Sequence, residues 1–437
     1  MKRYVAHVVI EAQTPLKVGG GKSGLLYDAP VQKDFNSLPM VLGTSLAGIL
    51  RAALENNSDD KAFVAEIFGT KDESRPENQK GSKLAISNAL LVGKDDMVYE
   101  KLLEQKDSFL SNFSDLPIRE HTAITAMGVA KDASKFDEEI VFKGTRFKFS
   151  LELDGSESEF RQVLNLLGLP TLRLGGGGSK GFGKLKIVEI KYAHLGLDEY
   201  SSSLNDNAIS QKFELSTQTS NEFIKYELRI TPENFFMFGS GFGDEDADMT
   251  PVFESVIDYD SGDIANKQIL IPASSIKGAL SHRTAFYYNK AMLDESKEHK
   301  NVGEQNTAVR EIFGFKKDKN INGKKGRVLI SDCFKSYNKQ GEKSITKTFD
   351  HVAIDRFTGG AIDGALFQEK TIGLREEFCI EIYLNSKDLS DTKSLDAFEN
   401  ALRDVATYRL PLGGATTKGH GFFSGNVYKN GINITEK

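Results

Sequence analysis

The chain has few of the residues and segments that mark several common classes of protein. It contains two cysteines, Cys333 and Cys379, whose separation fits no metal-binding motif, so the sequence argues against a zinc site and for a reducing compartment. No apolar run approaches the length of a membrane span, and the apolar part of the N-terminal segment is too short for a secretory signal peptide. We therefore expect a cytoplasmic protein with no membrane partner.

Positive charge is also in short supply. The 437 residues include 56 Lys and Arg against 62 Asp and Glu, which gives a formal net charge of −6. Because free nucleic-acid-binding proteins are usually basic, any nucleic-acid role must rest on local basic grooves or on partner subunits. Proline is scarce, with 10 residues, but glycine is abundant, with 40, which indicates many turns and loops. The length is sufficient for two or three domains with a sizeable core.

An internal repeat is the most informative feature of the sequence. Residues 174–183 read Leu-Gly-Gly-Gly-Gly-Ser-Lys-Gly-Phe-Gly and residues 412–421 read Leu-Gly-Gly-Ala-Thr-Thr-Lys-Gly-His-Gly. Further segments recur in the same order: 8–21 with 228–241, 42–50 with 272–280, 66–69 with 311–314, 86–88 with 330–332, 121–124 with 351–354, and 147–153 with 378–384. This order predicts two homologous domains, 1–193 and 223–437, joined by a polar linker at 194–222.

The same comparison predicts the fold class. Strand-like segments alternate with a few helical patterns in each half, which favours an α+β fold with a largely antiparallel sheet, and a ferredoxin-like core with insertions would suit it. Helical patterns run to about Leu54 and Tyr288, each preceded by a Ser/Thr pair at the expected N-cap position. The sequence does not fix the strand order.

Two nucleotide-binding motifs are formally present but lack the required context. Residues 176–181 satisfy G-x-G-x-x-G, yet a strand-like alternation follows where a dinucleotide fold needs a helix. Gly21-Lys22-Ser23 resembles the end of a P-loop, but Leu16 stands in place of its first glycine. We reject both motifs. The repeated glycine loops instead indicate either backbone amides held close to phosphates beside a lysine, or simple tight turns with positive φ.

An acidic loop follows the first glycine cluster in each half. Asp28 lies between that cluster and the first helix, where a carboxylate can hold a divalent cation or act as a base on a ribose hydroxyl; the alternative is a solvated loop residue. The corresponding loop of the second half is longer and more acidic. Aligning the Pro-Val pairs places Met249 opposite Asp28, with Asp246 and Asp248 just before it.

Three other features have both a functional and a structural interpretation. Residues 351–369 predict an extended hairpin that projects from the body, or an ordinary surface hairpin. Residues 315–327 hold six basic residues and one acid, which is typical of a solvated loop or of a phosphate contact. His121 and His351 could serve as general bases of an RNA-processing nuclease, but their matched positions favour a structural role.

Taken together, these motifs resemble the RAMP superfamily, specifically the backbone subunits of type III CRISPR effector complexes. The resemblance rests on residues 28–34 and 42–51 in the first half and on 271–280, 354–367 and 412–421 in the second. A single chain with two such domains is similar to the double-backbone subunit of the fused type III-D variant.

The resemblance implies a fold, partners and an activity. Each domain would have an RRM-like (ferredoxin-like) core, a glycine loop that binds crRNA and a thumb hairpin that displaces one base pair of the guide–target duplex. Other CRISPR effector subunits would complete the complex. Complementary target RNA would be cleaved beside each displaced nucleotide by its own 2′-hydroxyl, with a loop aspartate and Mg²⁺ or Mn²⁺, leaving a 2′,3′-cyclic phosphate and a 5′-hydroxyl. Since base pairing reads the sequence, the acidic net charge is tolerable.

The resemblance also assigns residues. Asp28 carries over as the catalytic and metal-binding residue of the first domain; in the second, either Asp246 or Asp248 takes this role or the site is inactive. The RNA-binding residues implied are Gly20, Lys22, Ser45, Arg51, Lys180, Gly181, Ser275, Lys277, Arg283, Arg356, Lys418 and Gly419.

The chain departs from the family pattern at several positions. Ala47 stands where the family often has Lys, Ser281 replaces an Arg, and Thr125 lies opposite Asp355. The leading hypothesis is an RNA-guided endoribonuclease subunit. The alternative is a catalytically inactive, structural crRNA-binding subunit.

Overall fold

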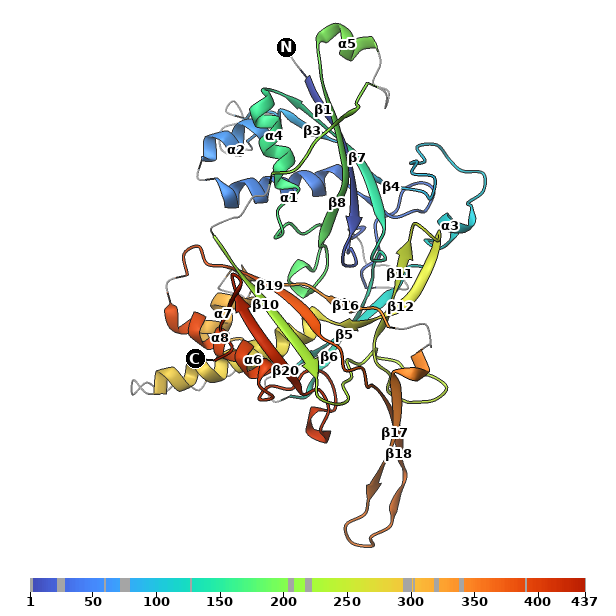
Figure 1. Ribbon diagram of the computed structural model, residues 1–437, viewed down its shortest axis with the longest axis vertical. Coiled ribbons are helices and arrows are strands. Elements are labelled where there is room, and N and C mark those ends of the chain that lie inside the picture. The colour runs from blue at the N-terminus through green and yellow to red at the C-terminus, as the bar shows by residue number, and fades with distance from the viewer. Residues whose placement is uncertain are drawn as a thin grey trace.

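The computed structural model describes the whole chain except residues 1–2, 22–27, 59, 71–78, 126–127, 203–207, 217–221, 294–300, 302, 318–321, 338–341, 390 and 437. The molecule is elongated, with the two main sheets one after the other along its long axis and most of the helices on the same side of each (Figure 1). Within the described residues, no helix has the length and apolar character needed to cross a membrane.

The N-terminal sheet has the strand order β2-β4-β7-β1-β8-β9, with β3 also paired to β7. Its strands are β1 (Arg3–Ala12), β2 (Met40–Val41), β3 (Leu84–Ile86), β4 (Ala89–Leu91), β7 (Arg146–Asp154), β8 (Leu185–Leu195) and β9 (Gln211–Lys212). The helices of this half are α1 (Gly43–Asn57), α2 (Lys61–Phe68), α3 (Ser108–Ser111), α4 (Glu157–Leu166) and α5 (Leu197–Ser202).

The C-terminal half repeats this plan. Its main sheet has the order β15-β19-β10-β20-β21, and a smaller sheet has the order β11-β12-β16. The strands are β10 (Phe223–Pro232), β11 (Phe253–Asp258), β12 (Asp263–Ile271), β13 (Gly314–Phe315), β14 (Lys324–Lys325), β15 (Val328–Ile330), β16 (Cys333–Lys335), β19 (Phe378–Asn385), β20 (Phe423–Lys429) and β21 (Ile432–Asn433). The helices are α6 (Ala273–Leu293), α7 (Thr307–Phe313) and α8 (Thr392–Ala406).

The central strands of the two main sheets are arranged in the same way. The N-terminal strand of each half pairs antiparallel with two later strands, β1 with β7 and β8, and β10 with β19 and β20. Side chains of β7 alternate strictly between half-buried and buried, because successive residues of a strand point to opposite faces. The prediction of a mixed helix-and-strand fold with largely antiparallel sheets is confirmed.

Each half also has a two-stranded hairpin outside its main sheet. β5 (Ile118–Ile124) pairs with β6 (Ala130–Glu139), and β17 (Thr346–Ile354) pairs with β18 (Ala361–Ile372). The β17–β18 hairpin projects far from the body (Figure 1), whereas the root of β5–β6 is packed against the second half through Arg119. The projecting hairpin agrees with the prediction made for residues 351–369.

The prediction of the helix caps is wrong in detail. No side chain at the start of α1 caps the helix; its first amide, Gly43 N, donates to Asn88 Oδ1 at 2.9 Å, and Ala273 N of α6 donates to Asp332 Oδ1 at 2.8 Å. The Ser/Thr pairs lie inside the first turns instead. The described residues of the predicted linker, 194–222, include α5, β9 and the fully buried Ile209.

Candidate nucleic-acid interface

An aspartate is attached to the root of each hairpin in the same way. In the first half, Asp137 N of β6 donates to Asp28 Oδ2 at 3.2 Å, and Asp28 N donates to Asp137 Oδ1 at 2.9 Å. In the second half, Gln368 N of β18 donates to Asp248 Oδ2 at 2.8 Å. Both aspartates are exposed, so each carboxylate is held by the backbone yet remains accessible.

These contacts correct the alignment of the two acidic loops. The residue after each aspartate forms a parallel bridge with a hairpin glutamate, Ala29 with Glu138 and Met249 with Glu369. Met249 therefore corresponds to Ala29, and Asp248 occupies the position of Asp28. The second loop has one more residue between the aspartate and the Pro-Val pair, so aligning those pairs shifted the comparison by one residue.

Asp246 is in a different setting. Lys370 of β18 forms a close ion pair with Asp244, and its Nζ lies 3.5 Å from Asp246 Oδ2. This lysine lowers the pKa of Asp244. Asp244 and Asp246 thus face a hairpin lysine, whereas Asp248 has the backbone contact that Asp28 has.

The glycine-loop lysines face buried glutamates at the hairpin roots. Lys180 Nζ lies 3.5 Å from Glu138 Oε1, and Lys418 Nζ lies 3.1 Å from Glu369 Oε2. Glu138 also forms a close ion pair with Lys17. Although burial alone would raise the pKa of Glu138, His121 and these lysines lower it to about 2. The lysine side chains remain about one-third exposed, so each links the loop to its hairpin and still has one face in water.

The two predicted histidines lie in the same clusters. His121 Nε2 is 3.3 Å from Glu138 Oε2, and its ring stacks on Phe136 at 5.1 Å between centroids. His351 stacks on Phe367 at 4.9 Å in the second half. These positions are beside the hairpin root, which fits the structural role that their matched spacing favoured.

The first glycine loop packs against the start of α6 in the second half. Asp332 N donates to Gly181 O at 3.5 Å, and a Cβ on Gly181 would lie 2.0 Å from Asp332 Oδ1. Lys277 Nζ donates to Ser179 Oγ at 3.4 Å. Burial and the nearby Lys180 lower the pKa of Lys277, and burial, Lys17 and Lys316 lower that of Lys180, against the opposing effect of Glu138.

We call Lys17, Lys180, Lys277 and Lys316 the lysine cluster. It lies at the contact between the two halves, where burial and nearby lysines disfavour the positive charges of Lys180 and Lys277. An anion bound there would relieve that cost, because opposite charge favours the protonated form.

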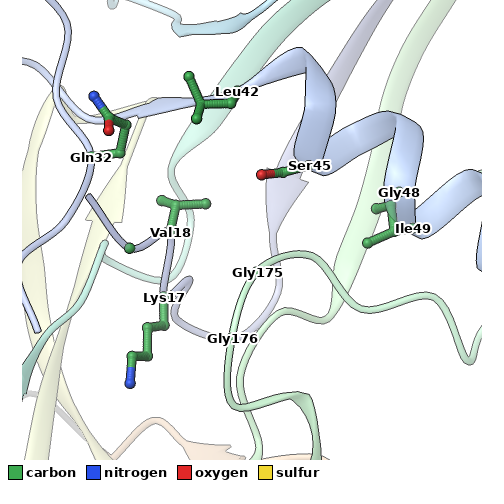
Figure 2. Close-up of a pocket in the computed structure, with 10 residues that line it drawn as sticks. Lys17, Val18, Gln32, Leu42, Ser45, Gly48, Ile49, Gly175 and Gly176 are labelled. Atoms are coloured by element: carbon green, nitrogen blue, oxygen red, sulfur yellow. The ribbon is translucent and has the colours of Figure 1, made fainter. Parts of the chain in front are cut away.

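A hollow of about 320 Å³ adjoins this cluster in the first half (Figure 2). Ser45 and Gly48 of α1 line one side, and Lys17 and the glycine loop at Gly175 and Gly176 line the other. Gly20 is exposed nearby, where its amide donates to Pro30 O at 3.0 Å. The hollow thus joins the helix start, the first glycine cluster and the glycine loop.

The remaining predicted RNA-binding residues are dispersed. Arg51 pairs with Glu55 on the same helix, and Arg283 forms an ion pair with the buried Asp404 of α8, so both arginines have partners within the fold. Ser275 is exposed on the first turn of α6, Gly419 is in an open turn with φ +94°, and Arg356 is exposed at the tip of the β17–β18 hairpin. Lys22 lies outside the described residues.

No group of three or more His, Cys, Asp or Glu side chains could hold a metal ion within the described part of the chain. Magnesium, however, is commonly held by one or two carboxylates together with phosphate oxygens of the substrate. Asp28 and Asp248, each exposed and anchored at one oxygen, fit that donor set.

Sequence reasoning missed the residues that organise the site. Glu138, Glu369 and Arg119 were not singled out, and Asn88 and Asp332 were noted only as part of a repeat. The sequence does contain a signal for Glu138 and Glu369, since Phe136-Asp-Glu138 recurs as Phe367-Gln-Glu369. Arg119 has no counterpart in the second half, where the matched position is Phe349.

The RAMP superfamily model matches residues 9–186 and 262–424. The chain is 26% identical over 211 residues to the CRISPR system Cms endoribonuclease Csm3 of Streptococcus thermophilus, a match that covers 42% of this chain and 86% of that protein. With Csm3 of Methanocaldococcus jannaschii the identity is 24% over 246 residues, covering 51% of this chain and 94% of the relative. The chain belongs to the RAMP superfamily, whose family model it matches in two separate regions.

Proposed function

We propose that this chain is a crRNA-binding backbone subunit of a type III CRISPR ribonucleoprotein and that it cleaves complementary target RNA at both of its domains. The two Csm3 relatives, both named as endoribonucleases, support the class of protein. The observation that carries the proposal is the matched pair of exposed aspartates, Asp28 and Asp248, held by equivalent backbone amides at the two hairpin roots.

The guide RNA would follow the lysine cluster and the adjoining hollow. A chain of phosphates would complement this group of lysines, of which Lys17 and Lys180 share Glu138 as an acidic partner, and such contacts are independent of base sequence. The net charge of −6 is compatible with this proposal, because the lysines need to line one face only.

The hairpins β5–β6 and β17–β18 would act as thumbs on RRM-like cores. The second hairpin carries exposed apolar side chains, including Phe357 at 99% exposure, Leu366 at 65% and Ile354 at 52%. Apolar side chains on a projecting hairpin are suited to insertion between stacked bases. Each aspartate would then lie beside the nucleotide that its hairpin displaces.

The cleavage step would be a transesterification within the target strand. The 2′-hydroxyl oxygen attacks the neighbouring phosphorus, the bond from phosphorus to the 5′-oxygen breaks, and the products are a 2′,3′-cyclic phosphate and a 5′-hydroxyl. Asp28 or Asp248 would accept the hydroxyl proton or hold the divalent cation; backbone attachment fixes the carboxylate for either task. A bound Mg²⁺ or Mn²⁺ would supply positive charge next to the phosphate oxygens.

The test uses the assembled complex, labelled complementary RNA and Mg²⁺. We expect Asp28→Ala and Asp248→Ala each to abolish a different product while crRNA and target binding are retained. Asp246→Ala serves as the matched control, since its ion pair with Lys370 leaves it outside the proposed site, and it should preserve both products.

An unchanged product pattern in both alanine variants would exclude cleavage and leave the structural crRNA-binding role. Loss of a product in Asp246→Ala but not in Asp248→Ala would instead exclude the assignment of the second aspartate. A metal-free reaction of the isolated chain on precursor RNA would favour the nuclease chemistry of His121 and His351.

A further inference from the structure

A buried glutamate occupies the root of each hairpin. Glu138 is 3% exposed and Glu369 is 0% exposed, and they are equivalent in the two halves because each bridges to the residue after a loop aspartate. A buried carboxylate costs free energy unless positive or donor groups surround it. Its presence at the same place twice therefore calls for a role in this site.

The groups around the two glutamates are the same in kind. Glu138 faces Lys17, Lys180 of the glycine loop and the His121 ring. Glu369 faces Lys418 of the other glycine loop at 3.1 Å. The His351 ring, with Nε2 at 3.8 Å, and the His420 ring, with Nε2 at 3.5 Å, complete the second cluster. Each glutamate thus joins a hairpin to the glycine loop of its own domain.

The backbone around each glutamate holds the aspartate loop. The residue before it binds the aspartate, through Asp137 N or Gln368 N. The residue after it binds the next loop carbonyl: Glu139 N donates to Ala29 O at 3.2 Å, and Lys370 N donates to Met249 O at 2.8 Å. One three-residue segment thus connects the aspartate loop to a side chain that anchors the glycine loop.

We propose that Glu138 and Glu369 are positioning residues for target cleavage, each holding its glycine loop and hairpin root in register with the loop aspartate. This inference rests on the proposed function. The glycine loop and hairpin would place the RNA, whereas the aspartate acts on it, so the rate depends on how firmly the two are held together. Misplacement of reacting groups by about 1 Å lowers a rate by about 100-fold.

The perturbation is Glu138→Gln and, separately, Glu369→Gln in the assembled complex. Glutamine keeps the shape but removes the charge that holds the lysines. We expect the single-turnover rate of one cut to fall about 100-fold, with the other cut unchanged and target affinity within about twofold of wild type. Glu189→Gln, which removes an exposed carboxylate that pairs with Lys191 on the same strand, is the control and should change neither cut.

Two further readouts separate positioning from other roles. The Mg²⁺ concentration for half-maximal rate should be unchanged, since the glutamate does not hold the metal. In the full chain without RNA, hydrogen exchange should rise in peptides that cover residues 28–31 and 175–183 for Glu138→Gln, and not in the equivalent peptides of the second half.

Several results would overturn the inference. Equal loss of both cuts, or loss of crRNA binding, would indicate a general structural role, and a shifted Mg²⁺ dependence would indicate a metal ligand. Unchanged cleavage in Glu138→Gln while Asp28→Ala abolishes its product would reject the positioning role and leave the proposed function intact. If Asp28→Ala and Asp248→Ala both cleave normally, the proposed function itself fails. Should Glu138→Gln not assemble, Glu369→Gln provides the same test in the other domain.

Discussion

Removal of the Arg119 guanidinium should weaken the contact between the two domains severely. Arg119 lies on β5 of the first domain and is 6% exposed. Its Nη2 donates to both carboxylate oxygens of Glu254, at 2.5 and 2.6 Å, and its Nη1 donates to Asp332 Oδ2 at 2.5 Å. Both acids belong to the second domain and are 6% exposed, so Arg119→Met would leave two buried carboxylates without their cation.

The size of the expected loss of stability follows from the burial of this ion pair. Removing one partner of a buried ion pair typically costs about 3 to 5 kcal/mol. For units of about 200 residues this corresponds to a fall of roughly 6 to 20 °C in the midpoint of unfolding. Arg161→Met is the control, because its exposed pair with Glu157, one helical turn away, is worth only about 0.3 to 0.5 kcal/mol.

Differential scanning calorimetry of the full chain would measure the effect. We expect Arg119→Met to lower the midpoint and to separate the unfolding of the two domains further, since a buried ionic contact between them is lost. The triple variant Arg119→Met, Glu254→Gln, Asp332→Asn should recover most of the loss, because no buried charge remains and asparagine already caps the equivalent helix as Asn88. A midpoint change no larger than that of Arg161→Met would refute the reasoning.

Three further predictions concern single positions. Gly181→Ala should lower the midpoint of unfolding by more than Gly419→Ala, because both have positive φ but only the first added Cβ would collide with Asp332; calorimetry of the pair measures the difference. Lys277→Ala should weaken crRNA binding. It should also reduce, by about 1, the magnitude of the slope of the logarithm of the association constant against the logarithm of the salt concentration, as measured by filter binding. Since the pKa of Glu138 is lowered from 4.5 to about 2, its ionised form stabilises the fold by up to about 3 kcal/mol above pH 4.5. That stabilisation should be lost as the pH falls from 4.5 to 2, and acid unfolding of Glu138→Gln should show a correspondingly smaller dependence on pH over that range.

Much of the fold was predictable because its signals are local or repeated. The alternation of β7 marks a strand with one buried face, and the repeated order of motifs predicts two units of the same plan. The glycine loops were also predictable as tight turns, since both contain residues with positive φ, including Gly181 and Gly419. Residues 194–222 are polar in composition, yet Leu195, Ile209 and Phe213 within them are buried.

The candidate site was predictable only in part. Asp28 could be proposed as a site residue from the sequence because its loop motif is contiguous. Asp248 was not distinguished from Asp246, because the choice depends on a hydrogen bond to Gln368, 120 residues away. The helix caps were misassigned for the same reason: Asn88, between β3 and β4, and Asp332, between β15 and β16, reach the helix starts from distant parts of the chain.

The sequence by itself determined the repeat, the strand and helix content and the family, because these follow from periodicity and from motifs of adjacent residues. The tertiary structure alone decided which charges face one another. Lys180 and Lys418, which the sequence presents as free phosphate ligands, lie against Glu138 and Glu369. Ion-pair partners are brought together when segments far apart in the sequence fold against one another, and a local sequence pattern does not specify which segments meet.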